Sequence, residues 1–298
     1  MFEFFRKLFK KPVHTVDMAT TAPLTEQQIQ SILHSQTVRY DVQQLAASTG
    51  QSVGKQRELN EDSLLALTST MAGNSGSLPF GLYIVADGMG GHQYGEIASN
   101  AAVRIVAGYV MRKFSPYLFN LNPTPPDESL QEIMQAAVKE AQKTIQHEAP
   151  SSGTTLTAAL VLGQQVTIAH VGDSRAYHIH PDGRAEVITR DHSLVKRLEE
   201  LGHISADEAA NYPHRNVLYR ALGQGDILEP DIFTITFPQT GYLMLCSDGL
   251  WGVLSDQDIF RVIKEAPSLH RACQNLVEAA NSAGGPDNIS VVLVQLIG

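Results

Sequence analysis

The chain has 298 residues and a formal net charge of −9, which arises from 31 acidic and 22 basic side chains. Hydrophobic residues make up 43% of the chain and charged residues 18%, a composition typical of a globular protein of one large domain or two modest ones. The acidic balance argues against a nucleic-acid-binding protein, because binding to phosphate backbones requires a basic face.

Membrane-spanning and disulfide-stabilised proteins are also disfavoured. No apolar run approaches the roughly 18 residues that a membrane-spanning helix requires. Cys246 and Cys273 lie far apart and lack the spacing of metal ligands, so neither a disulfide framework nor a zinc cluster is predicted. A reducing, cytoplasmic setting is the simplest expectation.

The N-terminal sequence MFEFFRKLFKKP combines aromatic and basic residues. Phe2, Phe5 and Phe9 share one face of a helix, and the basic residues between them favour contact with an anionic membrane surface. A tail that docks on its own domain and a disordered tail fit the same pattern, so peripheral membrane contact through residues 1–12 is one of three open interpretations. The charges follow and interrupt the apolar residues, which argues against a secretory signal.

Residues 12–37 are polar and contain prolines, so residues 1–37 are predicted to form an arm and linker, and residues 38–298 a single domain. Within this domain, short strand-like runs are expected at 39–48, 62–68, 80–86, 155–162, 165–170, 175–180, 185–189, 231–237, 241–246 and 289–296. Helical patterns cover 94–114, 127–147, 193–201, 255–264 and 269–282. Because strands come in runs and helices in pairs, the pattern predicts antiparallel sheets covered by helices, the layered α+β class.

Acidic residues recur where these apolar strands begin or end. Asp87-Gly88, Asp248-Gly249 and Asp287-Asn288 adjoin strand patterns, Asp173 follows another, and Glu61-Asp62 opens one. A single Asp-Gly is most often a plain turn, so the prediction depends on the combination. Several carboxylates in one place repel one another unless a cation offsets them, and oxygen-only ligands select Mg²⁺ or Mn²⁺ over zinc.

The order of these motifs resembles a known family. The matching blocks are Arg57-Glu-Leu-Asn-Glu-Asp, Asp87-Gly-Met-Gly-Gly-His, Ser152-Gly-Thr-Thr, Val171-Gly-Asp-Ser-Arg, Thr189-Arg-Asp-His-Ser, Cys246-Ser-Asp-Gly-Leu-Trp and Pro286-Asp-Asn-Ile-Ser. In sequence order they resemble the signature blocks of the PPM or PP2C-type metal-dependent serine/threonine protein phosphatases, the bacterial branch in particular. The resemblance extends from about residue 40 to the C-terminus.

This resemblance implies a sandwich of two antiparallel sheets flanked by paired helices, with a binuclear Mn²⁺ or Mg²⁺ centre at one end. The implied metal ligands are Glu61, Asp62, Asp87, Gly88, Asp173, Asp248 and Asp287. Asp87 would bridge the two ions, with the Gly88 carbonyl on one of them, and Asp248 and Asp287 would complete the other. Asp173 matches a position that helps to hold a third, weaker ion in bacterial members. Glu61 and Asp62 would bind directly or through water.

The resemblance also implies the reaction. A water molecule shared by the two ions would be ionised and attack the phosphorus of phosphoserine or phosphothreonine in line. Arg57 matches the arginine that clamps the substrate phosphate, a role that suits its planar, bidentate group. Arg57, Asp87 and Asp248 are therefore the expected catalytic residues, and residues 203–216 match a flap beside the site. The expected partners of this monomeric hydrolase are phosphorylated proteins, including a Ser/Thr kinase, and not nucleic acid.

Other functions fit the sequence less well. A catalytically silent phosphoprotein-binding module on the same fold would have lost ligands, whereas Arg57, Asp87, Asp248 and Asp287 are all present. A dedicated-partner phosphatase of the stress or sporulation type usually lacks the Thr189 block and the flap pattern. A dinucleotide-binding G-x-G-x-x-G motif fails at its third glycine, and neither cysteine begins the C-x₅-R loop of cysteine phosphatases.

One departure concerns the acid that protonates the leaving group. Eukaryotic members carry a histidine directly after the Asp-Gly, whereas Met89 occupies that place here. His92, three residues further on, is an alternative, although a lone histidine between glycines is more often structural or exposed. Our hypothesis is that a water molecule on the metal supplies the proton.

Overall fold

The structure is a computed structural model that describes residues 42–73, 76–90, 94–205, 208–209, 212–213, 216–225 and 228–298. The chain divides into the units Met1–Arg39 and Tyr40–Gly298, and all described residues belong to the second. The arm predicted for residues 1–37, its membrane contact, and His92 lie outside the described residues. The domain boundary near residue 37 therefore stays a prediction.

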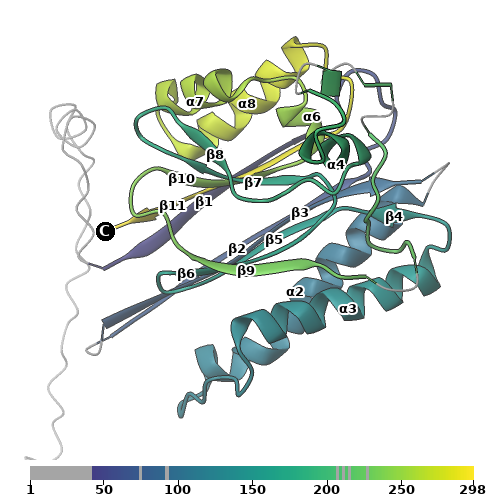
Figure 1. The fold of residues 1–298 in the computed structure, drawn as a ribbon. Coiled ribbons are helices and arrows are strands. Elements are labelled where there is room, and N and C mark those ends of the chain that lie inside the picture. The colour runs from purple at the N-terminus through teal and green to yellow at the C-terminus, as the bar shows by residue number, and fades with distance from the viewer. Residues whose placement is uncertain are drawn as a thin grey trace, which may run out of the picture. The chain divides into compact units, whose positions relative to one another are not determined.

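Two antiparallel sheets form the centre of the described part of the chain (Figure 1). The first has the strand order β1-β11-β10-β7-β8 and the second β2-β3-β5-β6-β9, with β4 paired to β3. The strands are β1 Gln44–Ser52, β2 Asp62–Gly73, β3 Gly76–Met89, β4 Gly153–Thr154, β5 Leu156–Leu162, β6 Gln165–Val171, β7 Arg175–Ile179, β8 Ala185–Val187, β9 Asp231–Thr236, β10 Tyr242–Cys246 and β11 Ile289–Ile297.

Paired helices cover the outer faces of both sheets, so that the layers follow the order helix, sheet, sheet, helix (Figure 1). The helices are α2 Gly95–Phe119, α3 Leu130–Glu148, α4 Leu194–Glu200, α6 Asp248–Trp251, α7 Asp256–Glu265 and α8 Leu269–Ser282. The pair α2 and α3 packs on the second sheet, and α7 and α8 pack on the first. This arrangement confirms the predicted α+β class.

Strand β3 shows why the sandwich forms. Successive side chains of a strand point to opposite faces, and both faces of β3 are apolar. Phe80, Leu82 and Ile84 pack against the helix pair, whereas Tyr83 and Val85 pack against the first sheet. Each large side chain buried in this way contributes roughly 1.5–3 kcal/mol, so the strand is fixed from both sides.

The first strand differs from the prediction at 39–48, because β1 spans Gln44–Ser52. Its own sequence, QLAASTGQS, carries little apolar signal. The strand is defined by continuous pairing with β11, from Gln44 opposite Ile297 to Ser52 opposite Ile289. A contact between the two ends of the domain, and not local hydrophobicity, therefore sets its position.

Serine hydroxyl groups accept a capping hydrogen bond at the start of α3, α4, α7 and α8, and α3 has a complete capping box. Ser129 Oγ accepts from the Glu132 backbone N–H at 3.2 Å, and the Glu132 carboxylate accepts from Ser129 N at 2.8 Å. Caps of this kind stabilise a helix by about 1 kcal/mol.

We expect Ser129→Ala to lower the free energy of unfolding by about 1 kcal/mol, because the Glu132 backbone N–H loses the hydroxyl that accepts its hydrogen bond. Urea unfolding followed by circular dichroism measures the change. Ser282→Ala, at the exposed last position of α8, is the control, with an expected change below about 0.5 kcal/mol. Equal stability of Ser129→Ala and wild type would show that the box does not stabilise α3.

Candidate metal centre and active site

Two of the predicted carboxylates lie directly opposite one another in the second sheet. Asp62 is the first residue of β2, and the register pairs it with Asp87 near the end of β3. Like charges at opposed positions of an antiparallel pair destabilise it. The pairing is therefore unfavourable unless something positive lies between the two side chains.

The first sheet supplies further carboxylates at the same end of the sandwich. Asp248 begins α6 directly after β10 and Ser247, and Asp287 lies just before β11. Ser247 joins the two sheets, because its hydroxyl donates to Asp62 Oδ2 at 2.8 Å and accepts from Ser290 N at 2.9 Å. The strand ends are thereby tied together where the acidic residues meet.

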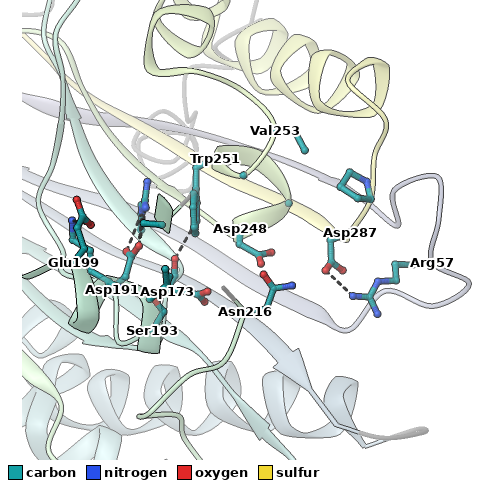
Figure 2. A pocket seen from close by; sticks show the side chains of 17 residues that line it. Arg57, Asp173, Asp191, Ser193, Glu199, Asn216, Asp248, Trp251, Val253 and Asp287 are labelled. Carbon is teal, nitrogen blue, oxygen red and sulfur yellow. Dashed lines mark hydrogen bonds and ion pairs between the residues drawn. The ribbon is translucent and has the colours of Figure 1, made fainter. Parts of the chain in front are cut away.

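Asn288 holds the loop that carries Arg57 and Glu61. Its amide nitrogen donates to the carbonyl oxygens of Val53 and Leu59, both at 2.8 Å, and its amide oxygen accepts from Glu61 N at 2.8 Å. Arg57 Nη2 then reaches Asp287 Oδ2 at 2.7 Å (Figure 2). A single buried asparagine thus brings the phosphate-clamp candidate to the carboxylates.

Asp87 and the turn that contains Asp173 are connected by hydroxyl groups. Asp87 N donates to Thr155 Oγ1 at 2.9 Å, and Thr155 N donates back to the Asp87 carbonyl at 2.8 Å. Thr155 Oγ1 also lies 2.7 Å from Ser174 Oγ, next to Asp173. The Ser152-Gly-Thr-Thr motif therefore positions the backbone of a candidate ligand.

These residues surround a cavity of about 200 Å³. It is lined by Arg57, Glu61, Asp87, Gly88, Met89, Gly90, Thr155, Asp173, Asn216, Leu218, Asp248 and Asp287. A second cavity of about 470 Å³ shares Arg57, Asp173, Asn216, Asp248 and Asp287 with it (Figure 2). Asp62 is not among the lining residues of either cavity, because it is buried, and its carboxylate accepts a hydrogen bond from Ser247. The structure thus brings all the sequence-predicted site residues to one place.

Glycines follow two of the aspartates because the backbone is crowded there. A Cβ atom on Gly88 would lie 2.2 Å from the Gly95 carbonyl oxygen, and one on Gly249 would lie 2.0 Å from the Asn288 carbonyl oxygen. Real Cβ atoms do not approach this closely, so only glycine lets these segments meet.

Burial and mutual repulsion perturb the carboxylates. Burial, with the charges of Asp248 and Asp287, raises the pKa of Asp62 to about 7. Burial and the neighbouring carboxylates likewise raise the pKa of Asp87 and of Asp173 well above the ordinary value. Without a cation, the folded protein therefore resists full ionisation of this cluster.

The donor set fits hard divalent cations. Every candidate ligand offers oxygen, either from a carboxylate or from the Gly88 carbonyl, which matches Mg²⁺ and Mn²⁺. Asp62 Oδ1 is buried and accepts no hydrogen bond from any residue that the structure describes. A cation in the cavity would satisfy this oxygen.

Comparison with known proteins identifies the family of the chain. The family model of protein phosphatase 2C matches residues 46–289. The chain belongs to this family. Its bacterial serine/threonine phosphatase relatives include stp of Listeria innocua, 37% identical over 214 residues, which are 72% of this chain and 84% of the relative.

Solved structures of family members share the fold. The serine/threonine phosphatase PstP/Ppp of Mycobacterium tuberculosis has a TM-score of 0.69 and 31% identity, covering 86% of this chain and 100% of that one. The catalytic domain of PstP in complex with two manganese ions has a TM-score of 0.66 and 29% identity, with the same coverage. These matches confirm the resemblance to the bacterial PP2C-type phosphatases and the sandwich.

Several supporting residues of this PP2C-type site were not singled out from the sequence. Trp251 Nε1 donates to the Asp173 carbonyl at 3.1 Å, and the Arg175 guanidinium lies 3.6 Å from the centroid of the Trp251 ring. Arg175 also donates to both carboxylate oxygens of Asp191, to Oδ1 at 3.0 Å and to Oδ2 at 2.7 Å. All three lie inside the quoted blocks, so the blocks themselves were the available signal.

Other predictions concern residues at the edge of the site. Of the flap predicted at 203–216, Asn216 lines both cavities, and part of the segment lies outside the described residues. Met89 lines the smaller cavity, and the leaving-group acid stays a hypothesis. No helix in the described part of the chain combines the length and hydropathy needed to cross a bilayer.

We expect Mn²⁺ to raise the melting temperature of the wild type, because a ligand at a hundred times its Kd adds about 2.7 kcal/mol. For a domain of this size the shift is roughly 5–10 °C. Asp248→Asn removes one charge and is expected to retain less than half of it. Differential scanning calorimetry with Mn²⁺ or a chelator measures the shift, with Asp127→Asn, an exposed position, as control. Identical shifts in Asp248→Asn and Asp127→Asn would show that Asp248 is not a metal ligand.

The metal-free protein should lose stability as pH rises. Asp62 titrates at about 7 in the folded state against an ordinary value of 3.8, so the folded state holds a proton that the unfolded chain releases. Stability from this group therefore falls between about pH 4 and 7. Melting temperatures in chelator at pH 5 and 7.5 test this, and Asp62→Asn is expected to fall less steeply. An equal or steeper fall in Asp62→Asn would contradict the assignment.

Proposed function

We propose that the carboxylate cavity is the active site for hydrolysis of phosphoserine and phosphothreonine in proteins, with two Mn²⁺ or Mg²⁺ ions. The family is one of metal-dependent serine/threonine protein phosphatases, and the proposal assigns the chemistry to residues. The observation that supports it most is the meeting of Asp62 and Asp87 from one sheet with Asp248 and Asp287 from the other. The relative with two manganese ions supports the number of ions.

The ligands divide by their place in the cavity. Asp87 lies beside carboxylates of both sheets and is therefore the bridging candidate, with the Gly88 carbonyl next to it. Asp248 and Asp287 would complete one ion site, and Asp62 and Glu61 would bind directly or through water. Asp173, which lies close enough to Asp248 for the charge of Asp248 to raise its pKa, would help to hold a third ion.

When bound, a pair of divalent cations lowers the pKa of a water molecule and offsets the charge on phosphoryl oxygens. The protein's own part is to position the substrate. Arg57 lines both cavities and is 49% exposed, so its guanidinium is accessible to an entering phosphate. Its planar donors match two phosphoryl oxygens, and the bond to Asp287 fixes its direction.

The larger cavity supports a protein substrate. At about 470 Å³ it exceeds what one phosphorylated side chain needs, and it opens from the carboxylates toward Lys196, Glu199 and Trp251. Side chains of both charges and an aromatic ring line it, which suits the residues on either side of a phosphoserine. A kinase among the substrates, a cytoplasmic location and a monomeric state stay predictions.

Arg57→Ala is expected to lower kcat/KM for p-nitrophenyl phosphate with Mn²⁺ by about 100-fold, because charge-assisted bonds to the phosphate contribute roughly 1.5–3 kcal/mol each. Arg57→Lys should recover part of the lost kcat/KM, since lysine restores the positive charge but not the planar, bidentate donor group. Arg104→Ala, which removes an exposed arginine on α2, is the control.

The same assay tests the enzyme itself. Chelator and Asp248→Asn should each reduce turnover to background on this substrate and on a phosphothreonine peptide. Equal rates with Mn²⁺, with chelator and in Asp248→Asn would reject catalysis at this cavity and favour a silent binding module.

A further inference from the structure

A second group of potential metal ligands lies on the hairpin of β7 and β8. His178 in β7 and His180 just after it are two residues apart, so they share one side of the strand. The register places Glu186 of β8 directly opposite His178. At about 3.3 Å per residue, the five positions from Arg175 to His180 correspond to roughly 17 Å, so the group is separate from the carboxylate cavity.

The three side chains are close enough to share one ion. The two imidazole rings have centroids 3.6 Å apart, and His180 Nε2 lies 3.1 Å from Glu186 Oε2. One ligand atom from each residue lies within 4.8 Å of the others. In the described part of the chain, this is where nitrogen ligands gather in such a group.

We propose that His178, His180 and Glu186 form a binding site for a divalent transition-metal ion of the Zn²⁺ class. Two imidazole nitrogens and one carboxylate are a ligand set that zinc accepts, with a water molecule as the fourth ligand. The carboxylate cavity, by contrast, offers oxygen alone and favours Mg²⁺ or Mn²⁺. The two sites thus differ in the metal that their donor atoms favour.

Hydrogen bonding orients His178 for this role. Its Nε2 lies 3.2 Å from the Thr240 carbonyl oxygen, which accepts the ring N–H. The neutral ring then carries its lone pair on Nδ1, which becomes the ligand atom. A backbone carbonyl on the second nitrogen is a common support of metal-bound histidine, because it fixes the tautomer and the ring direction.

The remaining geometry requires only a small adjustment. Ligand atoms on one tetrahedral zinc ion lie about 3.3 Å apart; His180 Nε2 and Glu186 Oε2 already lie 3.1 Å apart, and all three ligand atoms lie within 4.8 Å of one another. Glu186 is 67% exposed and can close the gap by changing rotamer. Arg184, the cation of the hairpin turn, is paired with Asp182 at 2.9 Å, so its charge is offset nearby.

Zinc uptake by the full chain tests the site. With excess Mn²⁺ present to fill the carboxylate cavity, equilibrium dialysis followed by elemental analysis should find one more Zn²⁺ in wild type than in His180→Gln. Isothermal titration should show that His178→Gln and His180→Gln each weaken zinc binding at least about tenfold. Mn²⁺-dependent turnover before zinc is added should be unchanged in both, because neither residue lines the active site.

His147→Gln is the matched control, because the described residues give His147 only Glu148 as a neighbouring ligand, at 2.9 Å. It should bind zinc like wild type. Glu186→Gln, at an exposed position that does not put folding at risk, should weaken binding as the histidine variants do. Zinc affinity and stoichiometry equal to wild type in both His180→Gln and Glu186→Gln would overturn the proposal.

Discussion

Repulsion between buried carboxylates is the constraint on which the rest of the site depends. Asp62 and Asp87 face one another across β2 and β3, and Asp248 approaches them from the other sheet. No local preference of the chain would hold them together, since each ionised group disfavours the next. The apolar layer between the sheets supplies the opposing force, because it fixes the strand ends whose aspartates meet. The core thereby sets the geometry of the charge cluster.

Much of this arrangement could be predicted from the sequence, for a definite reason. Strands with two apolar faces, such as β3, give continuous runs, and an aspartate after such a run marks a sheet edge. What could not be predicted depends on contacts between distant residues. Asn288 contacts Glu61 across 227 positions, and β1 is defined by its partner β11. The short helix α6, which starts at Asp248, was not predicted, because one helical turn has no periodicity to detect.

Strand β7 links two regions of different donor chemistry. At its start, Arg175 stacks on Trp251 and binds Asp191, beside oxygen donors that favour hard cations. At its other end, where His178 lies in the strand and His180 just after it, imidazole nitrogen replaces carboxylate oxygen as the main donor. The difference arises from side-chain type alone, since both ends belong to one antiparallel sheet. Metal preference is thus encoded residue by residue on a common backbone.

The position of β11 has a consequence for biosynthesis. This last strand lies between β1 and β10, and the asparagine just before it organises the loop that carries Arg57. During synthesis, the nascent chain therefore contains every candidate ligand except Asp287 before β11 has been made. A chain truncated before residue 287 would lack both Asp287 and the strand that organises the Arg57 loop, so it is expected to have no dephosphorylating activity even though the other candidate ligands are present.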